Sequence, residues 1–273
     1  MTAMALRLGH SLLRNVGELR WEPTAKRVSA QVGGRTVVST SRARLVWEPG
    51  RVVPYYAVPE EDVDADLVPA PDFAGEEPGF VSLPDGTRIV TPGRFDYHTT
   101  DGDVLTIRAG GRELPAAAFR PADPDLAGYV VLDFDALDQW YEEDEQIVSH
   151  PRDPFSRIDI RQSSRPVRIE VDGTVLADSR RSRLLFETGL PVRSYLPRED
   201  VRLDLLQPSE TRTLCAYKGE ASYWSFGGQD IAWTYEQPLP DSAQITDLVC
   251  FFDERVETFV DGEPQERPWS PWS

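Results

Sequence analysis

Cysteine and histidine are scarce in this sequence of 273 residues, which has two of the first and three of the second. Cys215 and Cys250 lie far apart, and neither belongs to a CxxC or a mixed Cys/His spacing. We therefore expect neither a disulfide framework nor a metal site, and the sequence suggests no resident cofactor. A reducing compartment fits this pattern best, so the expected location is cytoplasmic.

Long apolar runs and an excess of positive charge are also missing. No stretch approaches the roughly 18 apolar residues of a membrane span, and the leader MTAMALRLGHSLLRN has too short an apolar core for a signal peptide. The net charge of -17 repels phosphate backbones and anionic lipid, so we expect no nucleic acid and no membrane partner. The best basic cluster, Arg180, Arg181 and Arg183, is interpreted as a solvated strand edge.

What the sequence does contain is an internal repeat. An offset of 139 residues pairs the segment 19–56 with 158–195 without a gap. Matched pairs include Val28 with Val167, Arg42 with Arg181, Arg44 with Arg183, Glu48 with Glu187 and Tyr56 with Tyr195. The copies diverge in length further on, and a repeat of this size corresponds to whole domains rather than to a solenoid unit.

We predict two domains on this basis. Residues 1–149 form a diverged first copy with an N-terminal extension, and residues 150–273 form a second copy with a Trp-rich tail. Two prolines stiffen the joint between them, which favours a fixed pseudo-twofold pairing.

Alternating residues predict the fold class. Val167, Ile169 and Val171 alternate with Arg168 and Glu170 before the hairpin signal Asp172-Gly173. Long helical periodicity is absent from both copies. Each copy is therefore predicted to be a small antiparallel β-sandwich or barrel with little helix, which makes the chain mainly β.

The stretch from Cys215 to Trp224, followed by Trp233-Thr-Tyr235, is the densest group of reactive, charged and aromatic residues. It predicts an aromatic pocket that binds a small molecule. The predicted ligand-binding residues are Tyr217, Lys218, Tyr223, Trp224, Trp233, Tyr235, Arg183 and Glu187. The candidates for catalysis are Lys218, Glu220 and Cys215. The alternative is that these aromatics are core residues and that Lys218 and Glu220 form a surface pair.

The repeat offers an internal control for this site. Placing Gly93 on Gly219 and Tyr97 on Tyr223 sets Pro92 opposite Lys218 and His98 opposite Trp224. Trp233 and Tyr235 then fall opposite Ala116-Ala117-Ala118. This register predicts that the second copy alone keeps the polar and aromatic groups of a pocket.

The chain resembles the DUF427 family, an uncharacterised bacterial and fungal group that also carries a nucleotidyltransferase label. The resemblance rests on TLCAYKGEASYWSF, AWTYEQPLP and LVCFFDERVETFVDGE, and it covers nearly all of residues 150–263. In the first copy it extends over residues 28–63 and faintly near 130–145. It implies a compact β domain with a cleft near the Tyr-Lys-Gly motif and no established activity. The paired acidic metal ligands and phosphate cradle of a nucleotidyltransferase are not visible in the sequence.

Three functions remain open at this point. The first is binding of an unknown small molecule in the second copy. The second is an enzyme, either a nucleotidyltransferase or one that uses Cys215 or Lys218 chemically. The third is a structural or adaptor protein, in which the Trp-rich tail after Arg267 folds onto its own domain or reaches a neighbouring chain of a homo-oligomer.

Overall fold

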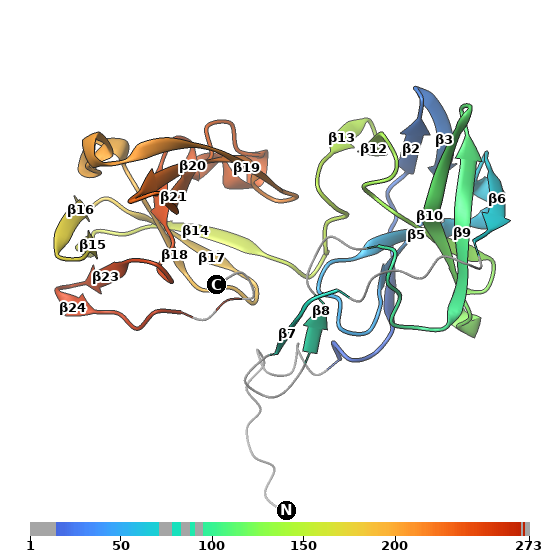
Figure 1. The fold of residues 1–273 in the computed structure, drawn as a ribbon, viewed down its shortest axis with the longest axis horizontal. Coiled ribbons are helices and arrows are strands. Elements are labelled where there is room, and N and C mark those ends of the chain that lie inside the picture. Colours follow the sequence, from blue (N-terminus) through green and yellow to red (C-terminus); the bar gives the residue numbers. More distant parts are fainter. Residues whose placement is uncertain (1–14, 71–77, 83–87, 91–94, 269, 271–273) are drawn as a thin grey trace, which may run out of the picture. The chain divides into compact units, whose positions relative to one another are not determined.

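The computed structural model describes residues 15–70, 78–82, 88–90, 95–268 and 270, and it divides the chain into two compact units, 1–153 and 154–273. Figure 1 shows that strands dominate both units. The helical segments of the described residues are short 3-10 turns, and none of them has the length and apolarity to cross a membrane. The chain is therefore mainly β, as its alternation predicts.

The first unit contains two antiparallel sheets. The larger has seven strands in the order β1 (Arg20–Pro23), β4 (Arg44–Trp47), β5 (Tyr55–Pro59), β11 (Tyr129–Leu132), β10 (Arg112–Pro121), β9 (Gly102–Ala109) and β6 (Asp66–Pro69). The smaller has the order β13 (Glu145–Ile147), β12 (Gln139–Glu142), β2 (Val28–Val32) and β3 (Arg35–Thr40). The turns η1 (Glu60–Asp62) and η2 (Pro124–Leu126) and the hairpin of β7 (Phe80–Ser82) and β8 (Arg88–Val90) complete it.

The two larger sheets of the first unit recur strand for strand in the second unit. Its larger sheet has the order β14 (Ile158–Gln162), β17 (Arg183–Glu187), β18 (Arg193–Leu196), β22 (Val249–Phe251), β21 (Gln229–Thr234), β20 (Gly219–Phe226) and β19 (Gln207–Cys215). Its smaller sheet has the order β16 (Thr174–Ser179), β15 (Val167–Val171), β23 (Glu257–Val260) and β24 (Glu263–Pro264). The turns are η3 (Arg198–Asp200), η4 (Leu203–Leu205) and η5 (Pro240–Ile245). The described strands form open sheets in both units, so each unit is a sandwich rather than a closed barrel.

The main core of each unit lies between its two sheets. In the second unit, Val167 and Ile169 of the small sheet are buried with Leu196 and Val249 of the large sheet. The residues between them on each strand turn away, because side chains alternate between the two faces of a strand. We call the face of the large sheet that is turned away from the small sheet its outer face.

A shared corner supports the repeat. Arg42 pairs with Asp62 at 2.7 Å in the first unit, and Arg181 pairs with Asp200 at 2.6 Å in the second. The hydroxyls of Thr40 and Ser179 donate to these same aspartates. The hairpin after β15 turns at Asp172 and Gly173, both with positive φ, which glycine adopts without strain.

The pairing of residues between neighbouring strands shows that one expected match, that of Tyr56 with Tyr195, is wrong. Arg44 pairs with Ala57 across the strands of the first unit, whereas the equivalent Arg183 pairs with Tyr195. Tyr195 is therefore equivalent to Ala57, and Tyr56 is equivalent to Ser194. Ala57 lies 13 residues after Arg44, whereas Tyr195 lies 12 residues after Arg183, so the first unit has one extra residue before this position. A slip of one residue moves every later side chain to the other face.

Strand pairing also shows that the expected alignment of the two copies around the Tyr-Lys-Gly motif is wrong. Strand β20 occupies the place of β9, so Tyr223 corresponds to Val104 and not to Tyr97. Gly93 itself lies outside the described residues. The first unit has a much longer connection before β9 than the second has before β20, and this insertion displaced the sequence match.

The same ladder assigns a different counterpart to Trp233. Phe119 lies opposite Val131, and Trp233 lies opposite Cys250, which is the equivalent residue on the next strand. Trp233 therefore corresponds to the aromatic Phe119 rather than to one of the alanines before it. By the same register, Tyr235 corresponds to Pro121.

Candidate functional site

A buried cluster covers the outer face of the large sheet in the second unit. Its members point to this face from the neighbouring strands β18 (Tyr195), β22 (Cys250) and β21 (Trp233), and from the position directly after β21 (Tyr235). Each is at most 8% exposed. The turn η5 lies over them through Ile245, which is fully buried in the same cluster. Alternation along these strands is what brings the aromatic rings together.

Lys218 and Glu187 form an ion pair beside these rings. Lys218 Nζ lies 2.5 Å from Glu187 Oε2, and each side chain is about 10% exposed. Gly219, with a φ of +90°, lets the chain turn sharply after Lys218, whose carbonyl accepts a hydrogen bond from Leu239 N. The alternative of a surface pair between Lys218 and Glu220 is wrong, because Glu220 is exposed and the lysine is buried against Glu187.

The hydroxyl groups of this cluster remain protonated. Trp233 Nε1 donates to the hydroxyl of Tyr195 over 3.1 Å. Burial raises the pKa of Tyr195 and of Tyr235 well above the usual tyrosine range, and it raises the pKa of the Cys250 thiol against the opposing effect of Arg193. These groups can therefore donate hydrogen bonds, but they cannot act as bases at neutral pH.

The structure brings some, but not all, of the remaining predicted residues to this cluster. Tyr223 packs against it and stacks on Phe252 with ring centroids 6.2 Å apart. Trp224 points to the opposite face, packs against the core between the sheets and donates from Nε1 to Thr234 Oγ1. Its strand position next to Tyr223 accounts for this separation.

The other candidates lie at the margin. Tyr217 is half-buried in the turn between β19 and β20, where its carbonyl accepts from Ser242 Oγ. Cys215 is half-buried at the end of β19. Arg183 donates to Gln162 Oε1 over 3.3 Å, away from Glu187's partner. Arg183 and Glu187 lie on the same face of β17, but Arg183 contacts Gln162 whereas Glu187 contacts Lys218.

Sequence reasoning missed an arginine on the same face. Arg193 donates to both carboxylate oxygens of Glu254, at 2.9 and 2.6 Å, and its guanidinium lies 5.7 Å from the centre of the Trp233 ring. Although burial acts to raise it, these hydrogen bonds lower the pKa of Glu254, which Ser270 also contacts. Trp269 and Trp272 of the tail lie outside the described residues. The sequence signal that could have revealed the pair of Arg193 and Glu254 is the acidic doublet Asp253-Glu254, which directly follows the apolar run 248–252.

A family model described as a domain of unknown function (DUF427), and labelled NTP_transf_9, matches residues 20–73 and 159–262, more than half of the chain. The chain belongs to the DUF427 family. The second DUF427 match contains every residue of the buried cluster, whereas the first ends shortly after β6. No curated protein matches the chain significantly.

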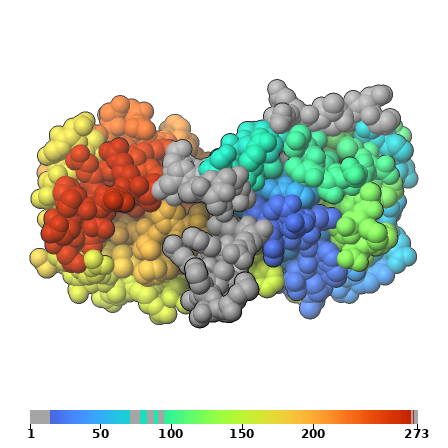
Figure 2. All heavy atoms as spheres, turned by 90° about the horizontal axis from the view of Figure 1, so that it is seen from below, coloured from blue at the N-terminus to red at the C-terminus, as the bar shows by residue number. Residues whose placement is uncertain are grey.

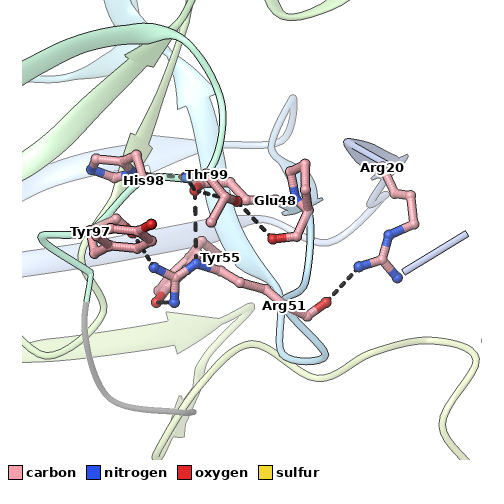
Figure 3. A network of polar contacts seen from close by, with 8 residues as sticks. Arg20, Glu48, Arg51, Tyr55, Tyr97, His98 and Thr99 are labelled. Atoms are coloured by element: carbon pink, nitrogen blue, oxygen red, sulfur yellow. Dashed lines mark hydrogen bonds and ion pairs between the residues drawn. The ribbon is translucent and has the colours of Figure 1, made fainter. Parts of the chain in front are cut away.

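The first DUF427 segment also carries a buried carboxylate. Glu48, the equivalent of Glu187, lies 2.7 Å from His98 Nδ1 and accepts from Thr99 N over 2.8 Å (Figure 3). Arg51 Nε lies 3.8 Å from the same carboxylate, and its guanidinium donates to the hydroxyl of Tyr55. The expectation that the first copy lost its polar groups is therefore wrong for this face of the sheet.

The stacking around His98 completes the likeness. Its ring lies on Phe119 with centroids 3.7 Å apart, and Glu187 of the second unit is close enough to Tyr195 and Tyr235 to raise the pKa of both. Both units thus combine a buried glutamate, a nitrogen donor and an aromatic ring on the outer face. Among the described residues, no three side chains of His, Cys, Asp or Glu are grouped so that they could hold a metal ion.

Proposed function

We propose that this DUF427 protein binds a small molecule at the outer face of the second unit. Lys218 anchors an anionic group of the ligand, and the rings of Trp233 and Tyr235 pack against its flat part. The observation that carries the proposal is the close contact of Lys218 with Glu187, in which both side chains are almost fully buried.

The energetics of this pair favour a binding role over a structural one. Removing two charges from water costs about as much as their attraction returns, so a buried ion pair is a poor source of stability. Yet a buried glutamate occupies the same sheet position in both units, as Glu48 and Glu187. Groups whose pKa is shifted gather at functional sites, and Tyr195, Tyr235 and Cys250 lie around this pair.

A thermal-shift titration tests the proposal with small carboxylates and phosphates, each with and without an aromatic ring. We expect a compound that has both groups to raise the melting temperature. The double variant Lys218→Met with Glu187→Leu should abolish this rise, and it leaves no unpaired buried charge.

The exposed pair of Arg202 and Asp204 provides the matched control. Replacing it by Met and Leu should leave the rise in melting temperature unchanged. A panel without any stabilising compound, or a rise that survives the Lys218 and Glu187 replacements, would contradict binding at this site.

A further inference from the structure

A cavity of about 340 Å3 opens between the two sheets of the second unit. It lies on the face of the large sheet opposite to Lys218, because the residues that line it alternate with Leu185, Glu187 and Tyr195. Its walls include Leu184, Phe186 and Ser194 of the large sheet, and Val167, Thr258 and Val260 of the small sheet.

The mouth of this cavity is apolar and exposed. Phe186 and Val192 line it and are 40% and 47% exposed. Figure 2 shows the C-terminal segment, in red, beside the gold surface of β17 and β18 on one face of the second unit. Gln265, Glu266 and Pro268 of that segment complete the lining.

In the first unit, aromatic rings occupy the equivalent place. Tyr56 and Trp140 stack there with centroids 5.2 Å apart, and both are 1% exposed. Trp47 is buried with them in the same core. The hydroxyl of Tyr56 donates to Glu142 over 2.7 Å, which holds the stack in place.

Strand pairing gives the counterparts of these rings. Leu45 pairs with Tyr56 where Leu184 pairs with Ser194. Trp140 pairs with Ala30 where Thr258 pairs with Ile169, the residue that corresponds to Ala30 in the repeat. Two large rings of the first unit are thus a serine and a threonine in the second, and the surrounding strands keep their places rather than closing the gap.

We propose that this cavity is a second binding site, which takes a planar aromatic molecule of one or two rings. The ligand's rings occupy the volume that Tyr56 and Trp140 fill in the first unit. Interiors of proteins are packed closely, and a void between sheets forfeits dispersion contacts that such a ligand restores. The volume also falls within the range of small-molecule pockets, which is roughly 300 to 1,000 Å3.

The polar lining narrows the ligand chemistry. Asp253 lines the cavity and accepts from Thr258 Oγ1 over 2.7 Å, while Arg193 approaches its other oxygen at 3.3 Å. A carboxylate at the wall favours a ligand with an N–H donor at the edge of its ring, such as an indole or an aromatic amine. Recognition here uses none of the residues of the proposed Lys218 site.

Ligand-observed saturation-transfer NMR tests this site on the full chain, with indole as the probe and cyclohexanol as the non-aromatic control. We expect saturation transfer to indole at millimolar concentration and none to cyclohexanol. Methyl shifts on adding indole should be confined to Val167, Leu184, Val192 and Val260. The double variant Ser194→Tyr with Thr258→Trp restores the rings of the first unit and should weaken indole binding at least tenfold.

The outcomes separate this site from the proposed function and from other occupants. Indole binding that persists in the Lys218→Met and Glu187→Leu double variant supports an independent site. Should the ring-restoring variant fail to fold, the methyl shifts of the unaltered protein decide the location. Shifts at methyl groups elsewhere, equal binding of cyclohexanol, or binding that arises only after residues 267–273 are deleted would overturn the proposal, the last because the chain's own end would then fill the cavity.

Discussion

Glu48 and Glu187 occupy the same position of the large sheet in the two units, but different donors hold them. Glu187 accepts from Lys218 Nζ, whereas Glu48 accepts from Thr99 N and lies beside His98. Continuing the register of β9 and β20 three to five residues toward the N-terminus makes Thr99 the counterpart of Lys218. The two equivalent carboxylates therefore receive their hydrogen bonds from the same point of the chain: Glu48 from a backbone amide and Glu187 from a lysine side chain.

Removal of one partner of the second pair should destabilise the second unit strongly. Lys218→Met leaves the carboxylate of Glu187 buried without its cation, and we expect a loss of about 3 to 5 kcal/mol in the free energy of unfolding. Adding Glu187→Leu should recover most of this loss, because the remaining charge is removed as well. Urea unfolding of the single and double variants measures both effects.

The exposed ion pair of Arg202 and Asp204 is the control for the loss of stability expected at the buried pair. Arg202 and Asp204 are both more than half exposed, so Arg202→Met should cost no more than about 1 kcal/mol. Equal losses for Arg202→Met and Lys218→Met would show that the buried pair has no special energetic role.

The strands could be read from the sequence because their signals are local. Val167 and Ile169 alternate with charged residues, and the Asp172-Gly173 turn follows directly. The gapless first part of the repeat fixed the common corner of the two units, since Arg42 and Arg181 make the same ion pairs. Fold class and repeat follow from such patterns without long-range information.

The faces of the later strands could not be read in the same way. A single extra residue before β5 moves Tyr56 into the core between the sheets, whereas Tyr195 points to the outer face. No local signal in the sequence marks where that residue is inserted. The equivalence of Phe119 with Trp233 likewise depends on pairing with β11 and β22, which are distant along the chain.

The stability of the first unit should depend on the ionisation of Asp133. Burial raises the pKa of this carboxyl from 3.8 to about 6. The folded state therefore binds its proton more tightly than the unfolded state, so the carboxyl costs nothing below about pH 3.8, destabilises increasingly as the pH rises from there to about 6, and costs a constant amount above that. Asp133→Asn should stabilise the protein at pH 7.5 by up to about 3 kcal/mol.

Denaturation at a series of pH values checks this expectation. The advantage of Asp133→Asn should shrink steadily between pH 6 and pH 4, because the buried carboxyl of Asp133 becomes neutral over that range. The asparagine can still accept the hydrogen bond from Asp135 N. Asp178, which is exposed on β16, is the control, and Asp178→Asn should show no such trend. An advantage that is the same at pH 7.5 and pH 4 would rule out a titrating cause.

The two thiols should differ in their reactivity. Cys250 is fully buried, and burial raises the pKa of its thiol against the lowering effect of Arg193, so little thiolate forms at neutral pH. Cys215 is half-buried. Iodoacetamide at pH 7.5 should alkylate Cys215 in the native protein and leave Cys250 unmodified, as peptide mass spectrometry would show. Alkylation of Cys250 without denaturant would mean that its strand opens readily.

Equivalent positions in the two units should respond unequally to truncation. Trp140 stacks between Tyr56 and Phe134 and donates to the carbonyl of Phe134, so Trp140→Ala should cost about 3 to 5 kcal/mol. Thr258→Ala at the corresponding site removes one hydrogen bond to Asp253 and should cost about 1 to 2 kcal/mol. Hydrogen exchange of the amides of β11 and β22 reports on each unit separately. Equal costs would mean that Thr258 supports its core as Trp140 does, which an open cavity at that position does not allow.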